Sequence, residues 1–574
     1  MKELLSGNAA IARGAFEAGV TVATGYPGTP STEILENLAR YPGVYAQWSP
    51  NEKVALEVGV GASLAGARVL VAMKHVGVNV AADPLMTLAY TGVNGGLVLV
   101  SADDPGMHSS QNEQDNRYLA RMAGIPMLEP SDSQEAKDMV ALALDLSETF
   151  DIPVMLRTTT RVSHSQSLVE LGARREPERR PYRKDAAKYV MVPAHARKRR
   201  LAWLERQEAL RRYAEECPVN VVVEGGDLGI VTSGVAYQYA LEAYPGATVL
   251  KLGLTNPLPA GLLRRFAERV RRILVVEELE PYLEEQLRAL GLTVEGKTLF
   301  PRQGELDPVV VARAGAAETP AEAGNALPAR PPVLCPGCPH RGVLYVLSRL
   351  RLTVMGDIGC YTLGVQPPLA AMDSCLCMGA SIGMALGMEK AAPEMAGRTV
   401  AVIGDSTFFH SGLTGLLDIV YNRGRTTVII LDNGTTAMTG HQDHPGTGRT
   451  LLGEEAPKLD LEQVVRGLGV RRVAVVDPYD LAAVRRAVRE ETAAPEPSVI
   501  IARRPCSLTV PPGPVPRVDP DACTGCGNCL RLGCPALALV EKVAVIDAEL
   551  CRGCGLCRQV CKTGAIREGD EERG

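Results

Sequence analysis

The chain has 574 residues, of which 46% are hydrophobic and 22% charged, and its formal net charge is −5. This is ordinary globular composition, and at roughly 150 residues per domain it predicts three or four domains. The balance of charge argues against a general nucleic-acid or membrane-surface binder. No apolar run reaches the length of about 18 residues that spans a bilayer. The N-terminal residues lack an export signal, so we expect a cytoplasmic protein.

Residues 1–165 alternate between helical and strand-like segments. A helix is predicted over residues 8–19, and short apolar strands follow at residues 69–73 and 97–101. Continuous apolar strands separated by helices indicate a parallel sheet in an α/β domain.

Residues 166–216 are predicted to form a basic helical linker. Positions 174–212 hold fourteen Lys or Arg against five acids. Such runs are usually solvated, and the alternative is a strap that docks on another subunit.

The α/β pattern resumes in two further regions. A small α/β domain is predicted over 217–311, an Ala/Pro/Gly-rich linker over 312–332, and another α/β domain over 333–510 with strands at 399–403 and 427–431. Four prolines between 511 and 516 form a stiff spacer before a cysteine-rich tail at 517–574. The predicted fold class is therefore α/β: two doubly wound parallel-sheet domains, an intervening small α/β domain and a C-terminal α+β domain.

The tail holds eight of the chain's 15 cysteines within its last 52 residues. They form two runs, Cys523-x2-Cys526-x2-Cys529-x4-Cys534-Pro and Cys551-x2-Cys554-x2-Cys557-x3-Cys561. This doubled pattern resembles the bacterial two-cluster ferredoxins, in which the fourth cysteine of each run ligates the other [4Fe–4S] cluster. The resemblance implies one cluster on Cys523, Cys526, Cys529 and Cys561 and another on Cys551, Cys554, Cys557 and Cys534. The extra residue in the first run and Lys562 after the second depart from the pattern, and a pair of zinc sites is the alternative.

A strand at 399–403 runs into Gly404, Asp405 and Ser406, and 25 residues later a second strand ends at Asp432 and Asn433. This spacing resembles the thiamine diphosphate motif, although Ser406 replaces its third residue, a glycine. The resemblance implies Mg²⁺ held by Asp405, Asn433 and the backbone carbonyl of Thr435. Oxygen ligands suit Mg²⁺, which also binds phosphate groups, and backbone N–H groups at the turn can hold the diphosphate.

Residues 51–66 resemble the glutamate helix of thiamine enzymes, with Asn51-Glu52 followed by a Gly/Ala-rich stretch. Glu52 is the predicted catalytic residue, because a carboxyl group is needed to hydrogen-bond the aminopyrimidine ring and promote its tautomerisation. A single glutamate on a helix is otherwise a surface charge.

Together these motifs resemble the 2-oxoacid:ferredoxin oxidoreductases, and the likeness covers nearly the whole chain. Residues 26–34 match the family segment whose threonine lies beside the substrate, here Thr29, and residues 121–128 match the segment whose arginine binds the substrate carboxylate, here Arg121, with Arg117 close by. The closest form is the alpha subunit of indolepyruvate ferredoxin oxidoreductases. Residues 73–79 and 335–341 look specific to it, so His75 is expected to contact substrate and His340 cofactor.

This resemblance implies oxidative decarboxylation of an aryl 2-oxoacid, such as indole-3-pyruvate, to an acyl-CoA. The expected cofactors are thiamine diphosphate, Mg²⁺ and two [4Fe–4S] clusters, with CoA as a substrate. External ferredoxin would take the electrons. A small beta subunit would supply the family's gamma domain in an (alpha-beta)2 assembly. Nothing in the residues themselves indicates an indole pocket.

The family also has a cluster near the thiamine, and its pattern implies a third site at Cys335, Cys338, Cys360 and Cys506. Buried free cysteines are common core residues, which is the other interpretation. Two alternative functions remain open. A non-oxidative 2-oxoacid decarboxylase would need no electron acceptor, which the tail argues against. An electron-transfer or scaffold subunit with a decayed thiamine site would have no need of Glu52, Asp405 and Asn433 together.

Overall fold

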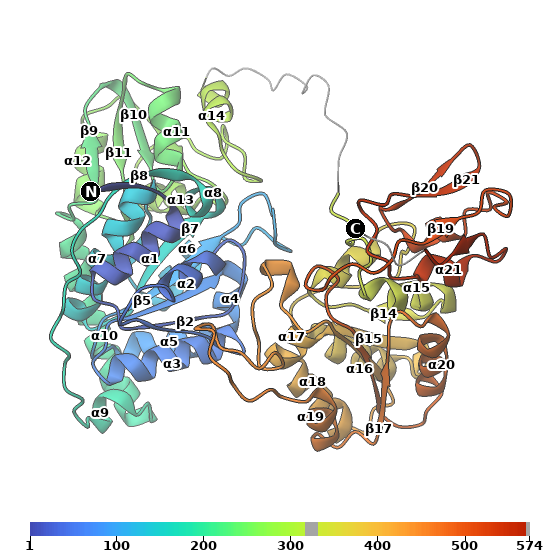
Figure 1. Ribbon diagram of the computed structural model, residues 1–574. Coiled ribbons are helices and arrows are strands. Elements are labelled where there is room, and N and C mark those ends of the chain that lie inside the picture. The colour runs from blue at the N-terminus through green and yellow to red at the C-terminus, as the bar shows by residue number, and fades with distance from the viewer. Residues whose placement is uncertain (316–330, 570–574) are drawn as a thin grey trace. The chain divides into compact units, whose positions relative to one another are not determined.

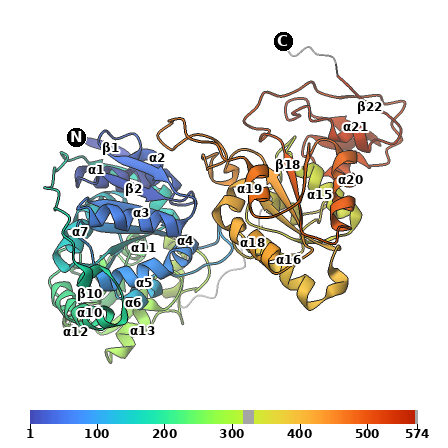
Figure 2. The same ribbon diagram turned by 90° about the horizontal axis from the view of Figure 1, so that it is seen from below.

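The computed structural model describes residues 1–315 and 331–569, and residues 316–330 of the predicted linker and 570–574 of the predicted tail lie outside the described residues. The chain divides into two compact units, Met1–Ala326 and Leu327–Gly574 (Figures 1 and 2). Among the described residues, no helix is both long and apolar enough to cross a membrane.

The first unit is built on a seven-stranded sheet. Its strands are β2 (Val22–Gly25), β3 (Tyr45–Trp48), β4 (Val69–Lys74), β5 (Leu97–Asp103), β6 (Met127–Leu128), β7 (Val154–Thr159) and β12 (Leu254–Asn256). They lie in the order β12-β6-β7-β5-β4-β2-β3, and all neighbours are parallel except β12 and β6. Strands β5 and β7 are buried along their whole length, which explains the apolar runs with which they begin, at residues 97–100 and 154–156.

Helices cover this sheet, as Figure 1 shows. They are α1 (Gly7–Glu17), α2 (Thr32–Leu38), α3 (Glu52–Leu64), α4 (His75–Val80), α5 (Ala82–Thr91), α6 (Arg117–Ala123), α7 (Ser133–Phe150) and α8 (Thr160–His164). A separate antiparallel ribbon joins β1 (Lys2–Ser6) to β8 (Gln166–Glu170). The predicted parallel-sheet architecture of this region is observed.

The small α/β region belongs to the same unit. Its sheet has the order β13-β10-β11-β9, from β9 (Val221–Val223), β10 (Gly226–Thr232), β11 (Ala247–Lys251) and β13 (Arg272–Val276), with helices α11 (Ala236–Ala243), α12 (Ala260–Ala267), α13 (Tyr282–Ala289) and α14 (Pro308–Gly315). Leu250, Phe266 and Tyr282 pack in one hydrophobic core with Leu85 and Met127 of the first region. Strand β12 also extends the larger sheet, so the two predicted domains share a core.

Buried ion pairs join these two regions. Arg117 is 1% exposed and pairs with Asp115 at 2.6 Å and with Glu277 of the small region at 2.7 Å. Its guanidinium also donates to the carbonyl of Glu278. Removing one partner from such a buried pair costs about 3–5 kcal/mol, because the other charge is left uncompensated.

The basic segment, which we predicted as a helical linker over 166–216, is only partly helical. It contains strand β8, a non-helical stretch, α9 (Ala186–Tyr189) and α10 (Pro193–Ala214). Pro177 and Pro181 lie in the non-helical stretch, and proline removes a backbone donor and disrupts a helix.

Residues 174–212, here called the basic strap, dock on the first domain instead of lying fully solvated. Several of its cations donate to carbonyls where helices end: Arg174 to Phe16, Arg179 to Ala65, and Arg199 to Tyr90 and Thr91. These carbonyls carry the partial negative charge of the helix C-terminus. Asp151 accepts hydrogen bonds from Lys188 and Arg199 and pairs with Arg206. Part of the excess positive charge is therefore matched by the surface on which the strap docks.

The second unit is built on a five-stranded, fully parallel sheet in the order β14-β15-β16-β18-β17. Its strands are β14 (Thr353–Met355), β15 (Thr399–Gly404), β16 (Thr427–Asp432), β17 (Arg472–Val476) and β18 (Ser498–Arg503). Alternate residues face two separate cores. One contains α15 (His340–Leu350) and α20 (Leu481–Thr492), and the other contains α16 (Ala380–Ala391), α18 (Leu413–Tyr421) and α19 (Leu461–Gly467). This is the predicted doubly wound arrangement.

The cysteine-rich tail packs on the first of these two cores. It contains two short ribbons, β19–β22 (Arg517–Val518 with Ile566–Arg567) and β20–β21 (Leu537–Val540 with Val543–Ile546), the 3-10 turn η5 (Cys529–Leu532) and helix α21 (Leu556–Val560). Leu532, Leu556 and Ile566 share a core with Leu344 and Val484. The tail is therefore part of the compact second unit.

Candidate functional site

Three predicted residues of the first unit follow neighbouring strands. Thr29 lies after β2, Glu52 begins the helix after β3, and His75 begins the helix after β4. Because β2 pairs in parallel with both β3 and β4, the carboxyl ends of these strands meet at one edge. The chain order reverses between β2 and β4, and ligands of doubly wound sheets bind outside such a point.

Glu52 is held at the start of α3 and is buried, with 6% exposure. Asn51 caps the helix, its side chain accepting a hydrogen bond from the Val54 N–H at 2.9 Å. A Cβ atom on Gly77 would lie 2.6 Å from Oε1 of Glu52. Only glycine at position 77 therefore admits the carboxyl group so close to α4.

Lys74 lies directly against the segment that carries Thr29. A Cβ atom on Gly28 would approach Cβ of Lys74 to 3.1 Å, and the Lys74 ammonium donates to the carbonyl of Ser109. Burial lowers the pKa of Lys74 to about 8, while the charge of Asp104 opposes this effect. A partly desolvated ammonium at this edge suits an anionic substrate. The sequence prediction gave Lys74 no role.

His75 is buried and positioned by the loop after β5. Its Nε2 lies 3.2 Å from Oδ1 of Asn112, and its carbonyl accepts a hydrogen bond from Asn116. Its Nδ1 is buried without a hydrogen-bond partner among the described residues. An imidazole with one unpaired nitrogen could contact a ligand, and the substrate contact of His75 stays a prediction.

Arg121, which we predicted to bind the substrate carboxylate, differs from Lys74 in its exposure to solvent. Arg121 is exposed on α6, and its charge acts on Tyr282 of the small region. Arg117, the neighbour that we also considered, is committed to its buried carboxylates. The described contacts thus favour Lys74 over either arginine as the anion-binding group next to Thr29.

The predicted diphosphate residues lie at the carboxyl edge of the second sheet. Asp405 follows β15 and Asn433 follows β16, which is its parallel neighbour. The Asp405 carboxylate accepts from the N–H groups of Ser406 and Gly434, at 2.9 and 2.8 Å. Ser406 in turn accepts from the Thr436 hydroxyl at 2.9 Å. The two motif halves are therefore joined directly.

The chemistry of this edge fits a divalent cation. Burial raises the pKa of Asp432, and the charge of Asp405 raises it further, so two carboxyl groups lie close together. Asn433 and Thr435 are buried beside them, the Asn433 amide oxygen lying 3.3 Å from the Thr435 N–H. Neighbouring carboxylates raise each other's pKa, and a bound cation would relieve this repulsion in addition to Arg503, which already pairs with Asp432.

Two histidines, His340 and His444, lie near Asp405. Burial lowers the pKa of His340 to about 4, against the effect of the Asp405 charge, so this imidazole is neutral near pH 7. His444 Nε2 approaches Oδ2 of Asp405 to 3.3 Å, without the geometry of a hydrogen bond. The prediction included His340 but not His444.

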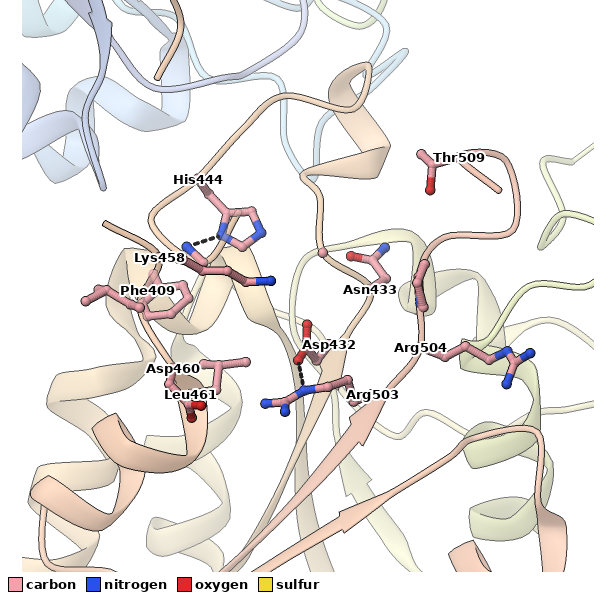
Figure 3. Close-up of a pocket in the computed structure, with 14 residues that line it drawn as sticks. Phe409, Asp432, Asn433, His444, Lys458, Asp460, Leu461, Arg503, Arg504 and Thr509 are labelled. Carbon is pink, nitrogen blue, oxygen red and sulfur yellow. Dashed lines mark hydrogen bonds and ion pairs between the residues drawn. The ribbon is translucent and has the colours of Figure 1, made fainter. Parts of the chain in front are cut away.

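A cavity of about 580 Å³ opens beside Asn433. Figure 3 shows His444 and Lys458 on one side of Asn433 and Arg504 on the other. Arg503 is paired with Asp432 at 2.7 Å, as the dashed line marks. Asp432 and Asp460 also line the cavity, and Arg504 pairs with Asp477, so Lys458 is the group there that suits an anionic ligand such as a phosphate group.

The tail cysteines lie in the crossed arrangement that the ferredoxin pattern implies. Burial raises the pKa of Cys557 to about 12, and the charges of Cys554, Cys551 and Cys534 add to the effect. These four thiols also line a single small cavity with Leu532, Leu537, Ile546 and Leu556. Burial likewise raises the pKa of Cys529, to which Cys561 and Cys523 contribute. The fourth cysteine of each run thus lies with the other run.

The four cysteines of the predicted third site also approach one another. Burial raises the pKa of Cys360 to about 11, followed by the charges of Cys335 and Cys506. Burial raises the pKa of Cys338 to about 12, with contributions from Cys360 and Cys335. Within the described ranges, no three His, Cys, Asp or Glu side chains converge closely enough to hold a single metal ion. The ligands of a cubane cluster bind four separate iron atoms, so they do not need to converge on one point.

Asp357 is a further residue that the sequence prediction did not identify. It is buried after β14 and accepts from the N–H groups of Gly379 and Ser381, at 2.8 and 2.9 Å. Tyr361 accepts from the Gly404 N–H and donates to the Ile358 carbonyl, both at 2.9 Å. These bonds tie the Cys360 turn to the Asp405 strand. The sequence signal for Asp357 and Tyr361 was their position next to Cys360, three residues before it and directly after it.

Comparison with protein families identifies both sheet domains. Residues 13–210 match the model described as "Pyruvate flavodoxin/ferredoxin oxidoreductase, thiamine diP-bdg", and residues 357–502 match "Thiamine pyrophosphate enzyme, C-terminal TPP binding domain". Residues 544–567 match "4Fe-4S binding domain", which covers the second cysteine run. The predicted thiamine domains and iron–sulfur tail are confirmed.

Curated relatives extend the likeness to the whole chain. The protein named indolepyruvate oxidoreductase subunit IorA is 44% identical in Methanothermobacter thermautotrophicus, over 99% of this chain and 97% of that one. The proteins of the same name are 43% identical in Archaeoglobus fulgidus, over 99% and 97%, and 41% identical in Pyrococcus horikoshii, over 99% and 98%. The chain therefore belongs to the family of indolepyruvate oxidoreductase IorA subunits, within the 2-oxoacid:ferredoxin oxidoreductases.

Proposed function

We propose that the chain is the catalytic large subunit of an indolepyruvate:ferredoxin oxidoreductase. An aryl 2-oxoacid, CoA and two oxidised ferredoxins yield the acyl-CoA, CO2, a proton and two reduced ferredoxins. The carbon–carboxylate bond breaks and a carbon–sulfur bond forms. One observation carries the proposal: a single chain combines two thiamine domains with a crossed set of eight thiols packed on the second one.

The first unit supplies the acid–base and substrate groups. Glu52 hydrogen-bonds the aminopyrimidine and moves a proton at its ring nitrogen, a role that its burial against Gly77 supports. Thiamine diphosphate, when bound, supplies the stabilised carbanion that decarboxylation requires. Thr29, His75 and the Lys74 ammonium bind the 2-oxoacid, with Lys74 on its carboxylate.

The second unit holds the diphosphate and its metal. Asp405, Asn433 and the Thr435 carbonyl bind Mg²⁺, and the backbone N–H groups after Gly404 hold phosphate oxygens. His340, which is neutral near pH 7 and close to Asp405, would contact this group without adding charge. The cavity beside Asn433 receives anionic groups at Lys458, which is its cation without an acidic partner among the described residues.

The cysteines hold the clusters through which the electrons would leave the site. Cys523, Cys526, Cys529 and Cys561 hold one [4Fe–4S] cluster, and Cys551, Cys554, Cys557 and Cys534 hold the second. Cys335, Cys338, Cys360 and Cys506 hold a third. A small beta subunit completes the enzyme in an (alpha-beta)2 assembly, and external ferredoxin is the acceptor.

The proposal is tested with anaerobically purified chain and its beta partner. We expect indole-3-pyruvate to reduce ferredoxin only when CoA is present, with the acyl-CoA as product. A non-oxidative decarboxylase would instead release the aldehyde without ferredoxin or CoA. Bound thiamine diphosphate together with aldehyde as the only product would contradict the oxidative function.

A further inference from the structure

Two arginines of the second unit are placed in an unusual way. Arg341 is 2% exposed, and its guanidinium donates only to carbonyls: to Leu532 at 2.7 Å, to Leu334 at 2.8 Å and to Cys335 at 3.0 Å. Arg552 donates to the carbonyl of Ser507 at 2.7 Å and to that of Val510. In the described part of the chain neither guanidinium has a carboxylate partner, and the Nε of each is buried without a hydrogen bond.

Such an arrangement is costly in an ordinary core. A buried charge without a counterion destabilises a protein by several kcal/mol, and carbonyl dipoles offset only part of this. The guanidinium of fully buried Arg341 therefore needs negative charge close to it, and that of half-buried Arg552 is stabilised by such charge as well. Among the described residues no acidic side chain pairs with either group, which leaves the thiols.

The thiols lie on both sides of these arginines. Arg341 and Arg552 line the same cavity as Cys534, Cys551, Cys554 and Cys557. Arg341 also donates to the carbonyl of Cys335, and Arg552 packs against Gly337, between Cys335 and Cys338. Burial raises the pKa of Cys338 and of Cys554, and the Arg341 charge opposes this rise at both thiols. Burial raises the pKa of Cys506, which Arg552 opposes in turn.

We propose that Arg341 and Arg552 form a positively charged wall between the Cys335/Cys338/Cys360/Cys506 group and the tail cluster of Cys534, Cys551, Cys554 and Cys557, and that this wall sets the reduction potentials on both sides. This inference rests on the proposed cluster sites. A cluster held by four thiolates is negatively charged, and each reduction adds one electron without making or breaking a bond. A buried cation favours the more negative, reduced form, and the potential of a cluster depends on such charge.

The arginines are positioning residues, so the test measures potentials and not activity alone. The full-length chain is purified anaerobically, and its clusters are titrated with dithionite while the reduced signals are followed by electron paramagnetic resonance. For Arg341→Met and Arg552→Met we expect the tail cluster to become about tenfold harder to reduce, a negative shift of about 59 mV for one electron. Arg341→Lys keeps the charge and should remain close to the unaltered chain.

A matched control removes a nearby exposed charge. Arg531 is exposed on η5, and Arg531→Met should leave the potentials unchanged, because solvent screens its charge. Full iron content with unchanged potentials in both Met variants would overturn the inference. So would equal loss of iron in the Met and Lys variants, because that result indicates a purely structural role. If the intact chain lacks the third cluster, the proposed third site fails, yet the shift of the tail cluster is still measured.

Discussion

The carboxyl edges of the two large sheets use different means to hold their functional groups. At the first edge Glu52 and the Thr29 segment are fixed by close approach to Gly77 and to Lys74, and the Lys74 ammonium is paired in charge with Asp104. At the second edge Asp405 is fixed by backbone amides and lies among carboxylates, imidazoles and cations. This difference matches the roles proposed above, in which the first edge serves proton transfer and substrate binding and the second edge binds the diphosphate.

The sharpest test of the first edge is Glu52→Gln. We expect turnover to fall by about 10²–10⁴-fold, because the amide keeps the shape but cannot supply the proton. Glu57→Gln is the control, since Glu57 is exposed on the same helix and pairs with Lys53. Near-normal turnover with normal cofactor binding in Glu52→Gln would remove that residue from the mechanism.

At the second edge the same comparison predicts a binding defect. Asp405→Ala and Asn433→Ala should each lose Mg²⁺-dependent thiamine diphosphate binding, measured by calorimetry, because the metal loses an oxygen ligand. Asp418→Asn, an exposed change on α18, should bind normally. Tight binding by both alanine variants would place the diphosphate elsewhere.

The electron-carrying role of the second unit is sharpened by an iron count. Changing Cys335 and Cys338 to Ser should remove about four irons of about twelve per chain, since each cubane contains four. Cys217→Ala should keep the full count, because that buried thiol lies beside Tyr213 in the first unit. An unchanged iron count in the double variant would contradict the third site.

The charge of Lys74 predicts a pH effect confined to the first edge. The group is protonated below its pKa of about 8 and neutral above it, so KM for the 2-oxoacid should rise as the pH increases through this value while kcat changes less. Lys74→Met should have a high KM at all pH values and lack the inflection. Lys53→Met, on the exposed face of α3, is the control. A KM that is independent of pH between 7 and 9, a window about one unit either side of that pKa, would exclude Lys74 from substrate binding.

The smallest expected effect concerns the basic strap, to which we assign no part in catalysis. Arg199→Met removes donors to Tyr90, Thr91 and Asp151. Each charged hydrogen bond contributes about 1.5–3 kcal/mol when buried, and partial exposure reduces this, so we expect the free energy of unfolding to fall by about 1–2 kcal/mol. Arg197→Met, which is exposed, should be neutral in the same denaturant titration. A change in turnover without a change in stability would give the strap a catalytic role.

The fold could be predicted where local sequence carries the information. Strands β5 and β16 each contain four consecutive apolar residues, 97–100 and 428–431, because both faces of their sheets are covered. Strand β12 has only three residues and pairs with a strand more than a hundred positions earlier, so no local pattern marks it. The docking of the strap was missed for a similar reason, because its acceptors are backbone carbonyls, which every residue has.

The candidate site divides in the same way. Glu52, Asp405 and the tail cysteines follow from short motifs with fixed spacing. Lys74, Asp357 and His444 are recognised only by their burial and by their neighbours from other strands, which tertiary packing determines. The motif predicts that Arg121 binds the substrate carboxylate. Its exposure on α6 and its electrostatic interaction with Tyr282 do not distinguish it as a binding group.

The pairing of β12 with β6 limits how this chain can be shortened. A chain ended at residue 216 would retain the whole thiamine-binding match of residues 13–210, but it would leave β6 as an uncovered sheet edge and Arg117 without Glu277. Uncovered edges invite pairing with other chains. The boundary of the autonomous folding piece therefore falls after the small α/β region, and fusions or crystallisation fragments that separate the two will yield aggregates.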